Sequence, residues 1–264
     1  LDHGAQINMP SLTDNAPVLH ALDKPELLEL LLQHGADFEV ADSLGRQALH
    51  LAVEQEHSEA LRILIQYGAR VNAPGPFGRE SLGLAIEKDF DVIDVLLAHG
   101  ADPNKPDHVG ERPLHIAARV DNPRAARMLL MSGAELSAVS FQGWTPLHIA
   151  ALHGSRAVAR VFAKEGVDVN LPGKRGQAPI FCAINHGDLE FVEFLIEHGA
   201  DIQQEDARGN SCLHEALINK KFSIAALFIE AGADLEKPNL AGMTPRKLIR
   251  EYKQEHLLTG SIYD

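Results

Sequence analysis

Histidine is the residue type in this sequence with the clearest capacity for chemistry, because an imidazole can bind a metal ion or transfer a proton near neutral pH. The 264-residue chain contains 14 histidines but only 2 cysteines. It has no H-E-x-x-H, paired C-x-x-C, G-x-S-x-G or phosphate-binding loop sequence, and the Glu after His214 is not followed by a second histidine at metal-binding spacing. We therefore expect no enzymatic activity, no metal site and no cofactor in these residues.

A Gly-Ala or Gly-Val pair recurs along the whole chain and organises these histidines. Its glycines stand 31 to 33 residues apart, at Gly4, Gly35, Gly68, Gly100, Gly133, Gly166, Gly199 and Gly232. A fixed period near this length indicates one supersecondary unit stacked many times. Such an architecture favours protein binding over catalysis.

The clearest unit shows how each copy folds. It reads Gly-Trp-Thr-Pro-Leu-His-Ile-Ala-Ala over residues 143–151 and Gly-Val-Asp-Val-Asn over residues 166–170. Thr145 is a good helix N-cap, and Pro146 fits the first helical position, where its missing N–H costs nothing. An apolar second helix follows and ends at Gly166, because glycine adopts a left-handed conformation at little cost.

This phrase resembles the signature of the ankyrin repeat, G-x-T-P-L-H-x-A-A followed by an apolar helix and G-A-D-x-N. The preceding unit reads Gly-Glu-Arg-Pro-Leu-His-Ile-Ala-Ala over residues 110–118. The resemblance covers essentially the whole chain and implies an all-α ankyrin-repeat α-solenoid of paired antiparallel helices with projecting hairpin loops. We place repeats at about residues 11–41, 42–74, 75–106, 107–139, 140–172, 173–205 and 206–238, with a partial repeat at 1–10 and a C-terminal cap at 239–264, in one array over 1–264. Because the chain opens within a repeat, we expect it to be a fragment of a longer protein.

Most of the histidines then have structural roles. Five occupy the T-P-L-H position, where we expect hydrogen bonds to the backbone of their own and the neighbouring hairpin: His20, His50, His115, His148 and His214. Four precede the glycine that ends a second helix, where a cation suits the helix C-terminus: His3, His34, His99 and His198. Among the others, His153 and His186 are one repeat apart, roughly 10 Å at normal interhelical spacing, which is too far for a shared metal.

Two repeats depart from the period. In the first full unit, Pro25 begins the second helix early. The unit containing Gly78 is one residue short and has Glu-Ser-Leu-Gly at 80–83 in place of T-P-L-H, after an apolar, proline-containing loop at 73–78. Either these are neutral drift in a tolerant array, or the loop shapes one edge of a binding groove.

The resemblance implies that hairpin tips and first helices line a concave groove, which we expect to bind a partner protein or peptide around residues 108–186. Phe141 and Trp144 would form the apolar anchor; alternatively, Trp144 folds over the hairpin base and packs within the array. We predict the partner-binding residues to be Phe77, Arg79, His108, Val109, Arg119, Phe141, Trp144, Leu152, His153, Lys174, Arg175 and His186. Arg119, Lys174, Arg175 and His186 would supply polar selection.

The predicted function is therefore that of a non-enzymatic interaction module or scaffold. The alternatives are a targeting module of a larger enzyme or effector and a purely structural spacer. The net charge of −13 and pI near 5.5 argue against nucleic-acid binding. The sequence also lacks an apolar run long enough to cross a membrane. We expect a monomeric chain in the cytoplasm.

Two further expectations concern single residues. Cys182 and Cys212 lie in the first helices of adjacent repeats, and we expect buried, reduced thiols, with a disulfide between them as the less favoured alternative. Some ankyrin arrays are hydroxylated at an asparagine near the end of a repeat. Asn72 and Asn170 partly match that pattern in this sequence.

Overall fold

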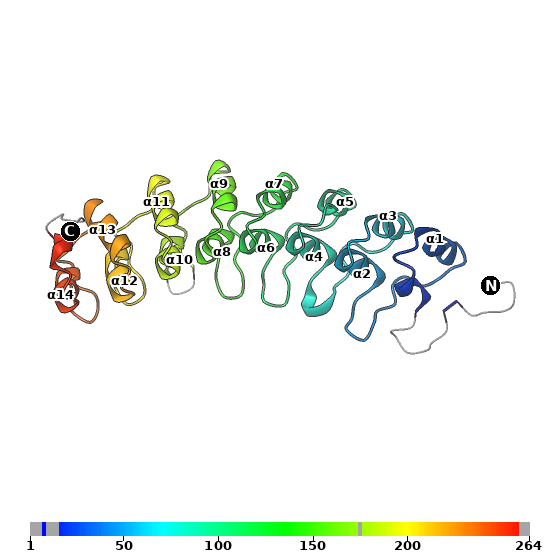
Figure 1. Ribbon diagram of the computed structural model, residues 1–264, viewed down its shortest axis with the longest axis horizontal. Coiled ribbons are helices and arrows are strands. Elements are labelled where there is room, and N and C mark those ends of the chain that lie inside the picture. Colours follow the sequence, from blue (N-terminus) through cyan, green and yellow to red (C-terminus); the bar gives the residue numbers. More distant parts are fainter. Residues whose placement is uncertain (1–6, 9–15, 174–175, 259–264) are drawn as a thin grey trace. The chain divides into compact units, whose positions relative to one another are not determined.

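The computed structural model describes residues 7–8, 16–173 and 176–258 of the chain (Figure 1). These residues form two compact units: the first contains the described residues up to 117 together with 124–135, and the second contains 118–123 and the described residues from 136 onward. Within these described residues there are helices and no strands, apart from isolated bridges between Ala41 and Gln47 and between Glu205 and Ser211. The expected all-α class is confirmed.

The first unit contains a short first and a longer second helix in most of its repeats. Its elements are η2 (Pro17–His20), α1 (Pro25–Gln33), α2 (Ala48–Glu54), α3 (Ser58–Gln66), η3 (Pro76–Gly78), α4 (Ser81–Glu87), α5 (Ile93–Ala98), most of α6 (Pro113–Arg119) and most of α7 (Pro123–Met131). Helix α2 packs against both α3 and α4, so the pairs stack in chain order. Helix α1 begins at Pro25, as the sequence predicts, and among residues 16–24 before it there is one 3-10 turn, η2.

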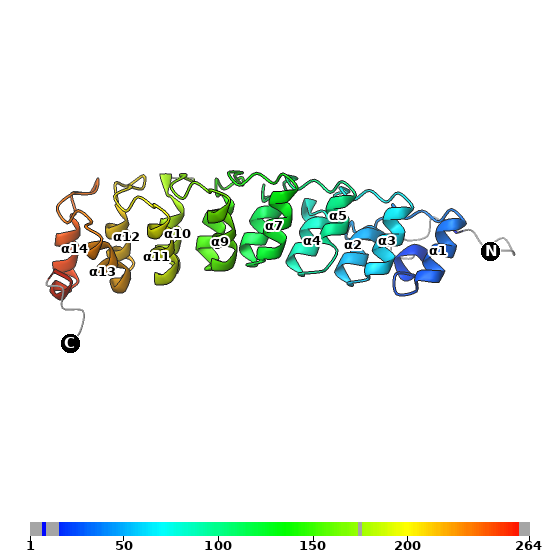
Figure 2. The ribbon, with the colours of Figure 1, turned by 90° about the horizontal axis from the view of Figure 1, so that it is seen from above.

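The second unit repeats the same pair with greater regularity. Its elements are α8 (Pro146–His153), α9 (Arg156–Lys164), α10 (Pro179–His186), α11 (Leu189–Glu197), α12 (Cys212–Ile218), α13 (Phe222–Glu230), α14 (Pro245–Glu251) and η5 (Glu255–Leu258). The first helices α8, α10, α12 and α14 contact one another in sequence. The second helices α11 and α13 lie side by side (Figure 2), in a layer separate from that of the first helices (Figure 1).

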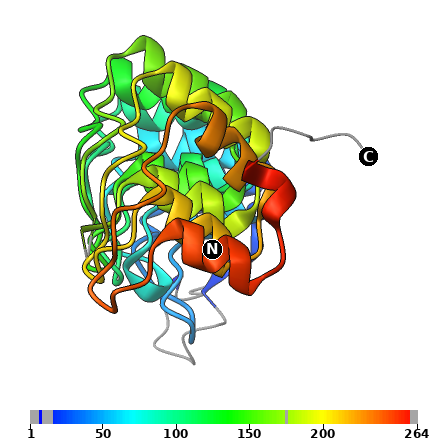
Figure 3. The same cartoon turned by 90° about the vertical axis from the view of Figure 1, so that its left-hand side faces the viewer.

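Local sequence signals set the helix ends. The Thr145 hydroxyl accepts a hydrogen bond from the His148 backbone N–H at 3.4 Å, so the predicted cap of α8 is present. Helix α9 is followed by Gly166 at φ +75°, in the left-handed conformation that favours glycine. In each unit the hairpin loops project to one side of the helices (Figure 3).

The core lies between the two helix layers of each unit. In the second unit it contains four fully buried phenylalanines, Phe162, Phe181, Phe191 and Phe228; in the first it is aliphatic, with Leu28, Leu61, Leu64, Leu82, Ile86 and Leu96. Ala150 and Ala151 have no exposed surface and allow close packing of α8. No helix among the described residues is long and apolar enough to span a membrane.

Asparagines at the end of a repeat join it to the next one. The Asn72 amide donates to the Gly100 carbonyl at 2.8 Å and accepts from the Asp102 N–H at 2.8 Å. Asn170 makes the same two bonds, to the Gly199 carbonyl and from the Asp201 N–H. Both asparagines proposed as hydroxylation sites are therefore structural bridges between neighbouring repeats.

Candidate functional site

The histidines of the T-P-L-H position are part of the backbone framework. The Thr145 N–H donates to Nδ1 of His148 at 3.2 Å, so Nε2 carries the proton and donates to the Gln177 carbonyl of the next repeat at 2.9 Å. His214 is held in the same way, by the Ser211 N–H and the Met243 carbonyl. These bonds confirm the predicted role and leave neither ring nitrogen available for a metal.

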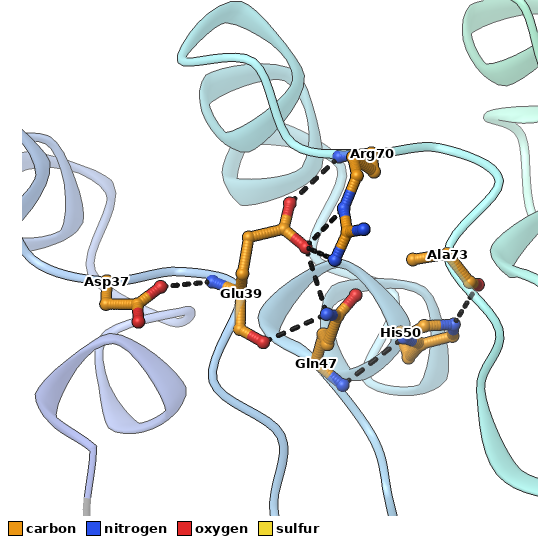
Figure 4. A network of polar contacts seen from close by, with 6 residues as sticks. All are labelled: Asp37, Glu39, Gln47, His50, Arg70 and Ala73. Carbon is orange, nitrogen blue, oxygen red and sulfur yellow. Dashed lines mark hydrogen bonds and ion pairs between the residues drawn. The ribbon is translucent and has the colours of Figure 1, made fainter. Parts of the chain in front are cut away.

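A close view of the first unit shows how far this network extends (Figure 4). His50 accepts from the Gln47 N–H and donates to the Ala73 carbonyl at 3.1 Å. The Gln47 side chain reaches Glu39, whose carboxylate is also bound by Arg70 at 2.7 Å. Burial lowers the pKa of His50, and burial likewise lowers the pKa of His214, because a charged imidazole is poorly solvated there.

The histidines that precede helix-ending glycines also have structural partners. The Nδ1 atoms of His34, His99 and His198 each lie 2.7–2.8 Å from the carbonyl four residues earlier. His3 lies outside the described residues. His20 is carried by a 3-10 turn and its side chain is exposed, unlike the buried His50, His115, His148 and His214. Among the described residues, no group of three or more histidines, cysteines and carboxylates could hold a metal ion.

Cys182 and Cys212 are free, buried thiols, as predicted. Burial raises the pKa of Cys182 to about 12, and it also raises the pKa of Cys212, so the reactive thiolate form is disfavoured at both. We expect neither thiol to react with Ellman's reagent in the folded protein at pH 8, and both to react after denaturation. An S137C variant supplies an exposed thiol as the control. A native thiol that reacted as fast as this control would contradict the burial.

The predicted anchor in the second unit divides into exposed and packed residues. Phe141 is 73% exposed at its hairpin, and Leu152 is 41% exposed at the end of α8. Trp144 is half-buried, with its ring centroid 5.1 Å from that of His148. A Cβ at Gly173 would lie 2.9 Å from Trp144 Cε3, so the indole packs against the next hairpin. Phe141 and Leu152 are therefore more available to a partner than Trp144.

The predicted residues of the first unit form a second, separate cluster. Phe77 is 74% exposed and has φ +57°, a conformation that is unusual for an aromatic residue. Its ring lies 5.5 Å from the ring of His108, and the His108 N–H donates to the Phe77 carbonyl at 3.2 Å. Val109 beside them is half-buried. The structure thus brings Phe77 and His108 together.

Arg79 is less available than the sequence suggests. Its guanidinium bonds both carboxylate oxygens of Glu87, at 2.7 and 2.9 Å, and lies 3.8 Å from Asp107. Arg46 and Glu54 form the corresponding ion pair one repeat earlier, at 2.8 Å. Trp144 and Leu152 occupy the same two positions in the second unit, eight residues apart. These two positions therefore hold ion pairs in the two repeats of the first unit and apolar residues in the repeat of Trp144.

The remaining predicted residues differ in exposure, and the His186 ring lies close to Gly154, the residue after His153. His153 and His186 are exposed and Arg119 is half-buried, while Lys174 and Arg175 lie outside the described residues. Leu240, which is 80% exposed, and Val139, which is 52% exposed, were not among the predicted site residues. Leu240 stands 99 residues after Phe141, three periods of 33, so the repeat register could have identified it.

Comparisons with known proteins agree with this architecture. The family described as ankyrin repeats (3 copies) matches at residues 3–75, 18–107, 82–173 and 165–239. The crystal structure of the ankyrin repeat domain of Bcl-3, described as a unique member of the IkappaB protein family, is similar with a TM-score of 0.74 and 26% sequence identity. That match covers 82% of this chain and 99% of the Bcl-3 chain. No curated protein matches the chain closely enough to count as a relative.

The number of structural matches limits what each one can say about function. In all, 588 solved chains match, and a fold shared so widely does not assign an activity. The family assignment rests on the repeats themselves, since their matches extend over most of the sequence. The chain belongs to the ankyrin repeat family.

Proposed function

We propose that this chain is a non-enzymatic module that binds another protein through its concave side, with Phe141 as the main apolar anchor. Ankyrin repeats are generally protein–protein interaction modules. The observation that carries the proposal is the exposure of Phe141 (73%) and Leu152 (41%) on one repeat, beside the half-buried Trp144. A cluster of exposed large apolar side chains is typical of an interaction surface.

The polar surroundings support recognition of a protein more than that of a small molecule. His153 and His186 are exposed near the ends of α8 and α10. Phe141, Trp144 and Leu152 line none of the four cavities that the structure describes here. An aromatic side chain that is exposed in the free protein becomes a binding hot spot when a partner excludes water around it.

Replacement of Phe141 by alanine tests the proposal. Once a partner has been purified, we expect F141A to weaken its binding at least about 10-fold, equivalent to about 1.4 kcal/mol. The change removes an exposed ring and leaves the fold intact. Isothermal titration calorimetry of the wild type and the variant measures the difference.

Met131 supplies a matched control, because it is 88% exposed but lies at the end of a second helix, α7. We expect M131A to bind the same partner with unchanged affinity. Equal loss in both variants, or no loss in either, would reject Phe141 as the anchor. The second result would mean that the partner binds elsewhere on the chain.

A further inference from the structure

The repeat that contains Glu80 lacks the usual polar framework at its first helix. In the repeat of Phe141, Thr145 caps the helix and His148 joins it to the next hairpin. Glu80 and Gly83 occupy these two positions at α4. The Glu80 backbone has φ −88° and ψ 166°, close to the −85° and 166° of Thr145. The backbone conformation is therefore retained while a carboxylate replaces the hydroxyl.

This carboxylate faces a small cavity of the first unit. Glu80 is only 6% exposed. The cavity measures ≈ 10 Å³ and is lined by Gly78, Arg79, Glu80, Leu82, Gly83, Lys105, Asp107, Glu111, Pro113 and Ile116. A water molecule needs about 10–15 Å³ of such volume and two or more polar partners. The cavity thus has the size of one water molecule.

Three polar atoms around the cavity lack hydrogen bonds within the described part of the chain. They are Glu80 Oε1, Asp107 Oδ2 and Arg79 Nε, and all are buried. Lys105 Nζ lies 3.7 Å from Glu80 Oε1, and Arg79 Nε lies 3.8 Å from Asp107 Oδ2, both beyond hydrogen-bond distance. Buried polar atoms are almost always satisfied by protein or by ordered water. A bridging water would satisfy them.

We propose that the cavity holds one water molecule and that Glu80 is protonated there. The Glu80 hydroxyl, the water and the Asp107 carboxylate then form a hydrogen-bonded bridge between two neighbouring hairpins, and this bridge depends on the proton. The Glu80 hydroxyl donates to the water, and the water donates to Asp107 Oδ2. The other oxygen of Asp107 already accepts the N–H groups of Val109 and Glu111. Loss of the proton leaves two buried carboxylates at one cavity.

The charged groups around Glu80 determine the pH at which this bridge is lost. Burial raises the pKa of Glu80 to about 7; Lys105 opposes this increase and Asp102 adds to it. Asp107, Glu111 and Arg79 also line the cavity, while α4 and α6 contribute only apolar residues and Gly83. The bridge is therefore formed below about pH 7 and broken above it.

The sign of the effect on stability follows from linkage. In the unfolded chain the Glu80 carboxyl ionises near its ordinary pKa of 4.5, whereas in the folded protein it keeps its proton up to about pH 7. The folded state thus binds more protons between these values, and its stability falls as the pH rises from 4.5 to 7. His50 and His214 have the opposite effect because their pKa values are lowered, so a variant comparison is needed.

The E80Q variant isolates the contribution of Glu80. Glutamine is uncharged at every pH and its amide can donate to the same water. We compare the melting temperatures of E80Q and the wild type at each pH. The advantage of E80Q should grow by about 4 °C or more from pH 5 to pH 7 and then remain constant to pH 8.5. The E29Q control, at an exposed position of α1 in the same unit, should show a difference independent of pH.

Two measurements on the wild type keep the test independent of how well E80Q folds. Carbon-13 NMR of the Glu80 carboxyl should give a titration midpoint near pH 7. A crystal structure at pH 6 should contain a water within hydrogen-bond distance of both Glu80 and Asp107. A pH-independent difference for E80Q, a midpoint below pH 5.5, or a cavity without the water would each overturn the proposal.

Discussion

Replacing Phe162 with alanine is expected to lower the free energy of unfolding by about 3–5 kcal/mol. Phe162 lies on α9 and has no exposed surface. Removing its ring loses the transfer free energy of the buried carbons and also leaves a cavity that rigid neighbouring helices fill only in part. Urea denaturation followed by far-ultraviolet circular dichroism measures the loss. If the units unfold separately, the change should appear in the transition of the second unit.

Phe141→Ala is the matched control for this change, because it removes the same side chain from an exposed hairpin position in the same unit. A substitution at such a surface position is expected to change stability by no more than about 0.5 kcal/mol. The Phe162 variant therefore tests the contribution of a buried ring to folding, whereas the Phe141 variant tests the contribution of an exposed ring to binding. Equal destabilisation by both variants would show that their burial is not as described.

His148→Ala is expected to cost about 2–4 kcal/mol. The imidazole has 1% exposure and links the Thr145 N–H to the Gln177 carbonyl of the next repeat. Its removal leaves the Thr145 N–H unsatisfied, which costs about 1–3 kcal/mol, and it takes one of two donors from the Gln177 carbonyl, which keeps the Gly173 N–H and loses about 1 kcal/mol. The same denaturation experiment measures the loss, which arises at the junction between two repeats.

His153, on the same helix, provides the comparison. It is exposed, and His153→Ala is expected to stay within about 0.5 kcal/mol of the wild type. A small effect for both variants would mean that solvent reaches the His148 site and replaces its hydrogen bonds. A large effect for both would assign a structural role to His153 as well.

Much of the fold can be predicted from the sequence because its signals are local and repeated. Thr145 and Pro146 start α8, Pro25 starts α1, and Gly166 follows α9 in the left-handed conformation. Each of these depends on the backbone geometry of a few neighbouring residues. The structural role of the T-P-L-H histidines was also predictable, since the same position returns with each repeat.

The candidate site was less predictable because it depends on contacts across a repeat or between repeats. The pairing of Arg79 with Glu87 joins residues eight positions apart, through the hairpin base and the end of α4. The burial of Glu80 depends on Lys105 and Asp107 from the following hairpin. The packing of Trp144 depends on Gly173, whose lack of a side chain makes room for the indole.

The bridges from the T-P-L-H histidines and from Asn72 point toward the following repeat, whereas Arg70 and Asn239 reach back to Glu39 and Asn210 of the preceding one. His50 and His148 each donate forward, to Ala73 and Gln177, and Asn72 reaches forward to Gly100. Shortening a unit from its C-terminal side would therefore expose side-chain donors of these bridges, whereas shortening it from the N-terminal side would expose the backbone carbonyls that accept them. Within each unit, the two ends of the chain are thus chemically different surfaces, one of donors and one of acceptors.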